Sequence, residues 1–294
     1  NHTRRKRYSV ARRNEAFFGQ LLAGGGRRKR RRTYHASRRR RTILYRQNGG
    51  MTNMLNLLKY QFRKLFKSIT FYCLLGFIFV GTLIDVLTFF GAGAYFVDYL
   101  THFNAMSFML FGLSVFVPVF VCDDYTSGAV KTVYGKGYTR TQNFFSKLIV
   151  CLAASAMISL FDIFLTRTLG VIFLKKSRID SRILRESAYM LFLNAFCMLG
   201  FTCVFFGIAE ILGKTILSVA TNLFGMFILT AVFTGIGMAI SYDLTQWLLD
   251  AATNGLNDLP MTNEGVLKAW TFPVVYSAVF LGLGYLFALR REVK

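Results

Sequence analysis

Residues 103–122 read FNAMSFMLFGLSVFVPVFVC, and residues 148–164 read LIVCLAASAMISLFDIF. Both stretches are almost purely apolar, yet residues 123–147 between them, DDYTSGAVKTVYGKGYTRTQNFFSK, are polar, basic and punctuated by glycine. A helix of about 20 residues is enough to cross the hydrocarbon core of a bilayer. The pattern therefore predicts two membrane-spanning helices joined by a polar segment that leaves the membrane.

Apolar and polar segments alternate in this way along most of the chain. Its 294 residues are 54% hydrophobic and include 31 Phe but only 3 Pro. That apolar share is larger than in a typical soluble domain. We therefore expect an all-α fold, a polytopic membrane protein in which residues 69–294 form a six-span domain. Each predicted transmembrane helix is long enough to cross a membrane, and the six cover residues 69–90, 105–122, 148–172, 188–209, 216–241 and 271–289.

Residues 51–68, MTNMLNLLKYQFRKLFKS, precede the first span. Their basic side chains recur every four residues, at Lys59, Arg63 and Lys67. A basic amphipathic helix of this kind lies in the membrane interface, with its cations near anionic lipid headgroups. We predict such an interfacial helix on the cytoplasmic side, although the first turns of a longer membrane helix fit as well. The apolar positions that share one helical face are Leu55, Leu58, Phe62, Leu65 and Phe66.

Most of the net charge of +22 lies in residues 1–50, which hold 15 Arg, two Lys and one acidic residue. Blocks of like charge such as RRKRRR at Arg27–Arg32 repel one another and are usually disordered. We interpret residues 1–50 as an Arg-rich disordered tail and weigh a non-native origin for it, because Met51 opens a well-formed membrane-protein start. The alternative is a membrane scaffold that uses the tail to bind anionic lipid; a nucleic-acid partner is not expected.

The distribution of Lys and Arg predicts the orientation, because these residues favour the cytoplasmic side. With both termini inside, and residues 1–50 set aside, the cytoplasmic segments hold twelve Lys and Arg and the outer loops hold six. The first outer loop has none, whereas the loop 175–186 holds five and breaks the rule. We predict a multi-pass protein of the cell membrane with both termini in the cytoplasm, so that residues 123–147 lie inside the cell.

No catalytic or cofactor site emerges from the sequence. The motif GKT at Gly213–Thr215 lacks the spacing of a phosphate-binding loop, because Gly207 lies one residue too far upstream. An odd number of cysteines without metal-ligand spacing predicts packing roles instead of disulfides or a metal site. We expect no catalytic residue, no cofactor and no metal in the chain itself. The five cysteines lie in or beside apolar segments, at Cys73, Cys122, Cys151, Cys197 and Cys203.

Three charged residues fall within predicted spans, at Asp85, Asp162 and Arg167. Ionisable side chains in lipid are costly and often mark an ion or substrate pathway. A secondary transporter or channel that uses these residues as an intramembrane polar site is therefore one candidate. A structural Asp–Arg pair between helices is equally compatible, although Asp162 and Arg167 are five residues apart and share a helical face poorly.

Local signals within residues 123–147 predict a short helix at the membrane surface. The hydroxyl of Thr126 or Ser127 can cap its start, and the helix would run through Val133. Gly135 and Gly137 then allow the left-handed turn that ends it.

The start of the next helix is also signalled, because Thr139 followed by Gln142 fits a capping box. The whole segment is thus expected to be compact and rigid. An ordinary membrane turn that carries positive-inside charges is the simpler alternative.

From Met51 onward the chain resembles the ABC-2 type permease subunits of ATP-binding-cassette (ABC) transporters. The resemblance covers the six-span layout, the amphipathic start and one motif. In that family an acidic residue, more often Glu than Asp, follows the second span; a Gly, a basic position, a Gly and an Arg come next, and a Lys opens the third span. The matching residues here are Asp124, Gly128, Lys131, Gly137, Arg140 and Lys147.

The resemblance implies a permease that pairs with a separate ATPase subunit and forms the translocation pathway with a second permease copy, as a homodimer or with a related subunit. The segment 123–147 would be a coupling helix that docks in a groove of the ATPase. Residues 242–270 would form an extracellular re-entrant or interfacial segment. The charged loop 175–186 and the Arg-rich tail depart from the family pattern.

Overall fold

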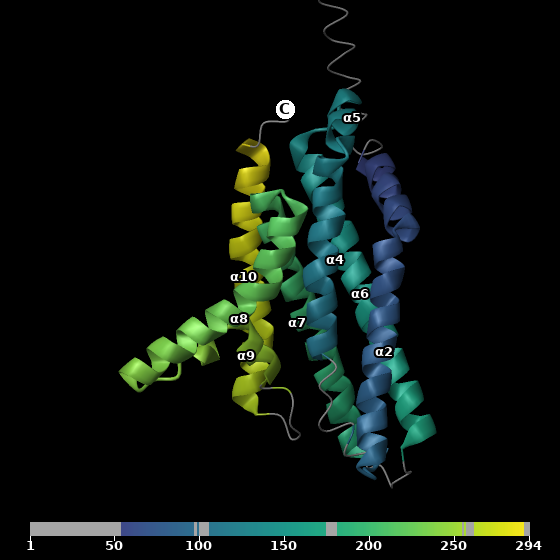
Figure 1. The fold of residues 1–294 in the computed structure, drawn as a ribbon, viewed down its shortest axis with the longest axis vertical. Helices are drawn as coiled ribbons and strands as arrows, with labels where there is room; N and C mark the ends of the chain where they lie inside the picture. Colours follow the sequence, from purple (N-terminus) through teal and green to yellow (C-terminus); the bar gives the residue numbers. More distant parts are fainter. Residues whose placement is uncertain are drawn as a thin grey trace, which may run out of the picture. The chain divides into compact units, whose positions relative to one another are not determined.

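The computed structural model describes residues 54–96, 99, 106–174, 181–254, 256 and 262–290. The predicted tail at 1–50 and the first half of the basic loop 175–186 lie outside these residues. The chain divides into two units, Asn1–Leu55 and Asn56–Lys294, and the helical bundle belongs to the second (Figure 1).

The described residues are almost entirely helical. A helix at residues 54–67 comes first, and six later helices are long and apolar enough to cross a membrane. The predicted all-α architecture of six spanning helices after an amphipathic helix is confirmed. In chain order the elements are α2 (Ile69–Gly91), α4 (Met106–Thr126), α5 (Ala129–Gly135), α6 (Arg140–Phe173), α7 (Ser181–Leu212), α8 (Thr215–Ile240), η1 (Thr245–Trp247), α9 (Leu249–Asn254) and α10 (Asn263–Arg290).

Three helices begin well before the apolar segments that predicted them, and α7 does so at Ser181, seven residues before the predicted start. α6 starts at Arg140 and α10 at Asn263, in each case eight residues before the predicted start. An apolar run stops at a charged residue, but a helix continues wherever that charge finds a partner. Lys147 in α6 is buried among acidic side chains, and Lys268 in α10 pairs with Glu264 at 2.6 Å.

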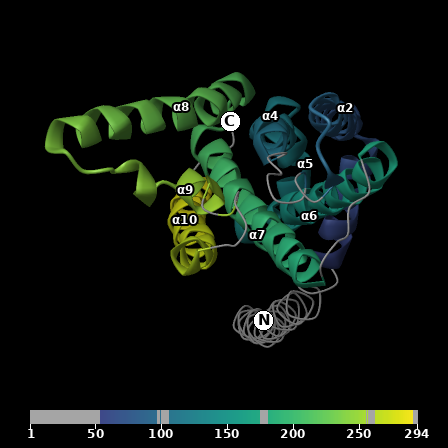
Figure 2. The same ribbon diagram turned by 90° about the horizontal axis from the view of Figure 1, so that it is seen from below.

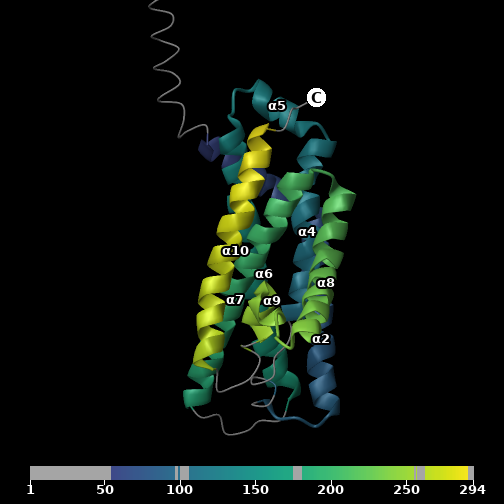
Figure 3. The same ribbon diagram turned by 90° about the vertical axis from the view of Figure 1, so that its left-hand side faces the viewer.

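Helix α5 lies at one end of the bundle, which we name the α5 end. The start of α6, the turn between α7 and α8 and the end of α10 lie at the same end, at the top of Figures 1 and 3. The end of α2, the start of α4, the end of α6 and the start of α7 lie at the opposite end. Consecutive long helices therefore alternate in direction, as consecutive membrane spans must.

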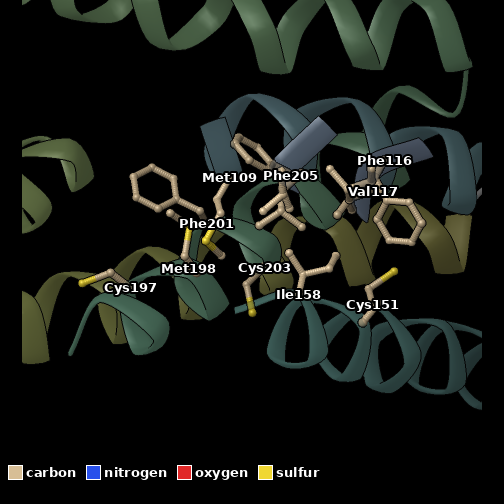
Figure 4. Packing of buried hydrophobic residues seen from close by; sticks show 14 of the residues in the cluster. Met109, Phe116, Val117, Cys151, Ile158, Cys197, Met198, Phe201, Cys203 and Phe205 are labelled. Carbon is tan, nitrogen blue, oxygen red and sulfur yellow. The ribbon is translucent and has the colours of Figure 1, made fainter. Parts of the chain in front are cut away.

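Helix α7 forms the centre of the packing and contacts α4, α6, α8 and α10. Its Phe201 and Phe205 lie in a cluster with Met109 of α4 and Ile158 of α6, as Figure 4 shows. All five cysteines are free. The predicted packing role is confirmed for the four that are buried, whereas Cys73 is exposed on α2.

Glycines let α7 and α10 approach closely. A Cβ on Gly207 of α7 would lie 2.5 Å from the carbonyl oxygen of Phe280 in α10, and one on Gly200 would lie 2.6 Å from the Cβ of Pro273. Small residues at such crossings drive membrane-helix association, because they maximise van der Waals contact between backbones. At these two glycines the backbone of α7 therefore lies directly against α10.

Helix α8 packs much more loosely. It leaves the bundle at an angle, and the chain returns through η1 and α9 (Figures 1 and 2). Along its length only Ser218, Asn222 and Gly237 are buried. Its apolar side chains, such as Phe224 and Ile228, face outward, which suits a helix surrounded by lipid.

We expect Gly207→Ala to destabilise the protein by about 1–3 kcal/mol, because the added methyl would collide with the backbone of α10, which cannot rotate away. Gly282→Ala is the matched control, since a Cβ there meets nothing within 4 Å; removing a helical glycine should leave stability unchanged or raise it by about 0.5–1 kcal/mol. Thermal unfolding of the purified protein in mild detergent measures both. Equal melting temperatures for the two variants would contradict the close packing.

Candidate functional site

The segment between α4 and α6 contains a short helix bounded by left-handed glycines. Gly128 precedes α5 with a φ of 71°, and Gly137 follows it with a φ of 87°. Side chains with a Cβ rarely adopt this backbone region, so both turns depend on glycine. The left-handed turn predicted at Gly137 is confirmed, whereas Gly135 is the last residue of α5 and has no positive φ.

The predicted hydroxyl cap of α5 is wrong. Gly128 occupies the N-cap position and makes no side-chain cap bond. The hydroxyls of Ser127 and Thr126 instead donate to the carbonyl oxygen of Asp123, at 2.7 and 3.1 Å. The Asp123 carbonyl, in the last turn of α4, also accepts from the Ser127 backbone N–H at 2.9 Å. Both hydroxyls therefore bond back onto α4 and do not accept from the first N–H groups of α5.

The predicted capping box of α6 is confirmed. The Thr139 hydroxyl accepts from the Gln142 backbone N–H at 3.2 Å, and the Gln142 side chain accepts from the Thr139 N–H at 3.0 Å. One residue on, the Arg140 guanidinium donates to the carbonyl oxygen of Leu289 in the last turn of α10. The connection from α5 into α6 is therefore anchored locally and to a second spanning helix.

Helix α5 has one buried and one exposed face. Val130 and Val133 are buried against the bundle, whereas Lys131, Thr132 and Lys136 are exposed. The buried valines hold the helix in place, and the exposed face presents two cations at the α5 end.

A buried ion network lies beneath α5. We define it as Lys64, Asp124, Lys147 and Glu210, which come from the 54–67 helix, α4, α6 and α7. The Asp124 carboxylate lies 2.6 Å from the Lys64 ammonium and 3.4 Å from that of Lys147. Gln61 also donates to Asp124, at 3.4 Å. Side chains that lie between 23 and 63 positions from Asp124 in the chain thus converge on its carboxylate.

Lys147 is the innermost member of the network, with 0% of its side chain exposed. Its ammonium lies 3.8 Å from Glu210, donates to the Val121 carbonyl at 3.3 Å and sits 4.3 Å from the centre of the Tyr125 ring. The Tyr125 hydroxyl donates to Glu210 at 2.6 Å. The buried ammonium has lost its hydrating water, and a carboxylate, a carbonyl and the face of an aromatic ring together compensate for that loss.

Lys64 closes the network on its outer side. Its ammonium also lies 2.8 Å from Asp123, which is exposed. Burial alone would lower the pKa of Lys64, but the charge of Asp124 and hydrogen bonds to both aspartates outweigh it and hold that pKa above its ordinary value. Lys64 therefore stays protonated and bridges the 54–67 helix to the end of α4.

The predicted coupling residues fall into three groups. Asp124 and Lys147 are brought into direct contact in the network. Gly128 and Gly137 form the turns on either side of α5. Lys131 is exposed on that helix, and Arg140 is tied to α10.

Sequence reasoning missed Lys64, Gln61, Tyr125 and Glu210. The 54–67 helix is amphipathic as predicted, but it buries Leu57, Gln61 and Leu65, whereas Leu55 and Phe66 are exposed. The polar ends of Gln61 and Lys64 reach Asp124, and this contact rotates the helix away from its most apolar face. The signal available in the sequence was the spacing of Leu57, Gln61 and Leu65 by four residues, which places an amide on a buried stripe.

The second predicted site, at Asp85, Asp162 and Arg167, has a different arrangement. The Thr82 hydroxyl lies 3.0 Å from Asp162, whereas Arg167 donates to Ser187 at 3.1 Å. Asp85 lies three residues beyond Thr82 on α2, and one of its carboxylate oxygens is buried without a partner. No ion pair joins Arg167 to either aspartate, all three being residues that the structure describes.

The GKT motif forms the turn between α7 and α8. Gly213 adopts a φ of 62° and Lys214 precedes the first residue of α8. Among the described residues, no group of three or more His, Cys, Asp or Glu side chains is arranged to hold a metal ion. Neither a scan of protein-family models nor a search of curated proteins finds a match for the chain.

We expect Lys147→Met to destabilise the protein by about 3–5 kcal/mol, because it leaves Glu210 and part of Asp124 as buried charges without their cation. The double variant Lys147→Met/Glu210→Gln should recover part of that loss. Lys131→Met, on the exposed face of α5, is the control and should change stability by about 0.5 kcal/mol or less. Thermal unfolding in detergent measures all three. A melting temperature for Lys147→Met as high as that of the control would show that the network is not stabilising.

Proposed function

We propose that this protein is the membrane-spanning subunit of an ABC-2 type exporter, and that α5 is the coupling helix through which a separate ATPase subunit drives it. The observation that carries the proposal is the construction of the α5 end. A two-turn helix is held there between two left-handed glycines, directly above a buried network that links four helices. An ordinary membrane turn needs none of these features.

The proposal depends on rigidity, because a flexible loop would absorb motion that a fixed helix transmits. Three attachments join α5 to the bundle. Its buried valines pack on the bundle itself. The network ties its entry from α4 to α6, α7 and the 54–67 helix. The capping box and Arg140 tie its exit to α6 and α10. A force on α5 would therefore move the ends of several spanning helices together.

The exposed face of α5 favours an acidic partner surface. Lys131 and Lys136 extend outward from it, and complementary charge at an interface speeds association and selects the partner. We infer a groove on the ATPase subunit that carries carboxylates opposite these two lysines. In this scheme the chain hydrolyses no ATP itself.

The exposed apolar faces of α8 and α10 support a multi-pass membrane protein. We propose that a second permease copy completes the translocation pathway. The most apolar windows of α8 and α10 are only 6% and 11% buried within the chain. Such faces need lipid or another membrane helix around them. We propose the cell membrane as the location, with the α5 end and both termini in the cytoplasm.

A secondary transporter remains the second candidate, on one observation. Asp162 and Asp85 lie on neighbouring spanning helices, since Asp162 accepts from Thr82, one helical turn from Asp85. No ion pair joins Asp162 to a cation among the described side chains. Flux driven by an ion gradient, in vesicles that contain this chain and no ATPase, would favour that function. The scaffold alternative depends on residues 1–50 and gains no support from the bundle.

We predict that Lys131→Glu/Lys136→Glu loses the ATPase partner. Tagged protein purified gently from its native membranes should carry ATP hydrolysis activity that vanishes when the chain is purified to homogeneity. In the double variant the co-purified activity should fall at least tenfold, because like charges facing each other at an interface cost several kcal/mol. Lys59→Glu, an exposed lysine on the 54–67 helix, is the matched control and should retain the activity. Equal activity in all three preparations would remove α5 from the coupling role.

The proposed orientation predicts which positions react with a membrane-impermeant maleimide. In a background in which exposed Cys73 is replaced by serine, Lys131→Cys should react only after the cells are opened. Tyr242→Cys, exposed just beyond α8 at the other side of the predicted membrane, should react in intact cells. Labelling of position 131 from outside would reverse the orientation and exclude a cytoplasmic ATPase as the partner of α5.

A further inference from the structure

Two cavities flank α8 where it diverges from the bundle. The larger, of about 290 Å³, lies between α8, α4, α7 and α9. The smaller, of about 150 Å³, lies on the side of α8 that faces α7 and α10. Four residues line both cavities, so the two spaces meet along one stripe of α7 and α8: Phe205, Asn222, Met226 and Thr230.

Asn222 differs from the other three residues of that stripe because its polar side chain is buried without hydrogen-bond partners. Its side chain is 2% exposed, and neither its amide nitrogen nor its carbonyl oxygen has a hydrogen-bond partner. A buried amide without hydrogen-bond partners lowers the stability of the fold, so its presence calls for an explanation such as a bound molecule that supplies the partners. In a membrane helix such a residue marks a functional site more often than in a soluble core. Its two donors and its acceptor are available to a molecule that enters the cavities.

The remaining polar groups of the larger cavity can only accept hydrogen bonds. The Ser114 hydroxyl donates to Phe111 within α4, at 2.7 Å, and the Thr230 hydroxyl donates to Met226 within α8, at 2.9 Å. Each hydroxyl oxygen keeps lone pairs that can accept a further hydrogen bond. Asp250, whose carboxylate accepts from Thr253 at 3.4 Å, adds a half-buried negative charge. Among the described residues that line the two cavities, none is basic.

The walls around these acceptors are apolar. In the larger cavity they are formed by residues such as Phe111, Leu223 and Phe227, and the smaller cavity is lined almost completely by aliphatic and aromatic side chains. A site with apolar walls, one orphaned amide, several acceptors and one carboxylate favours an apolar body with a hydrogen-bond-donating cationic head. It disfavours an anion, because no positive charge lines it.

We propose that the cavities around Asn222 bind an amphiphile with an ammonium head, the apolar body packing along α8 and the head reaching Asn222, Ser114 and Asp250. This site names a class of cargo for the exporter proposed above and in that respect depends on it. The binding itself requires no ATPase. The natural molecule is either a membrane lipid or a water-borne amphiphile, since both present the same chemistry.

The test measures binding of dansylcadaverine, an apolar fluorophore with a terminal ammonium, to the full chain in phosphatidylcholine nanodiscs. We expect saturable binding with one molecule per chain. Dansyl-6-aminohexanoate, which carries a carboxylate on a similar body, should bind at least tenfold more weakly. Adding phosphatidylethanolamine to the nanodiscs separates the two sources: competition identifies a lipid headgroup as the occupant, and its absence identifies a water-borne amphiphile.

Variants connect the binding to this place. Asn222→Leu should weaken dansylcadaverine binding about tenfold or more, by loss of hydrogen bonds to a charged group, without lowering the melting temperature, because it removes an amide that is unpaired in the empty site. A merely structural asparagine would instead lose stability. Leu223→Trp should fill the larger cavity and abolish binding, whereas the same substitution at its neighbour, Phe224→Trp, on the exposed face of α8, should not.

Equal binding of the two probes, or unchanged binding in both Asn222→Leu and Leu223→Trp, would overturn the site. Because the nanodiscs contain neither ATP nor ATPase, these results are independent of the coupling test on α5. Binding at Asn222 without co-purified ATP hydrolysis would leave the site standing and remove the exporter function. The converse result would leave the exporter standing with a different cargo site.

Discussion

The burial of the Lys147 ammonium is the constraint on which the α5 end depends. An apolar contact between helices tolerates small slides, because one aliphatic side chain replaces another at little cost. A buried cation does not, since a slide that separates it from Glu210 and Asp124 exposes three charges to a medium that cannot solvate them. Only one register of α4, α6 and α7 satisfies all three, and the position of α5 follows from that register.

The sequence was sufficient for the six spans and for parts of the α4–α6 connection, because those features depend on local chemistry. Apolar runs, the pair Thr139 and Gln142, and the glycine at 137 act within a few residues of themselves. What it could not provide was the partner of each charge. Glu210 lies 63 positions beyond Lys147 in the chain, and Lys64 lies 60 positions before Asp124.

Two expectations about local structure were wrong, each for its own reason. Ser127 was expected to cap α5, but its hydroxyl donates to the Asp123 carbonyl four residues earlier, in the last turn of α4. The apolar face of the 54–67 helix was expected at Leu55 and Phe66, but Asp124 draws Gln61 and Lys64 inward. At Ser127 one local bond replaced another, whereas in the 54–67 helix a contact that only the folded chain provides outweighed the local pattern. The errors therefore lie around the network, where polar contacts matter most.

The tightly packed α7–α10 pair and the loosely packed α8 suit a permease that a separate ATPase subunit moves through α5. Backbones of α7 and α10 meet at glycines, so sliding them apart would lose contact along the whole crossing. α8 buries few side chains, so tilting it costs little. The network joins the end of α4, which leads into α5, to α7, and α8 follows α7 after the single left-handed turn at Gly213. A push on α5 would then move the rigid α7–α10 pair as a unit, while α8 lagged and the cavities around Asn222 widened or closed. A coupled ATPase would then control the volume of these cavities, because they lie between the α7–α10 pair, which moves as a unit, and α8, which does not move with it.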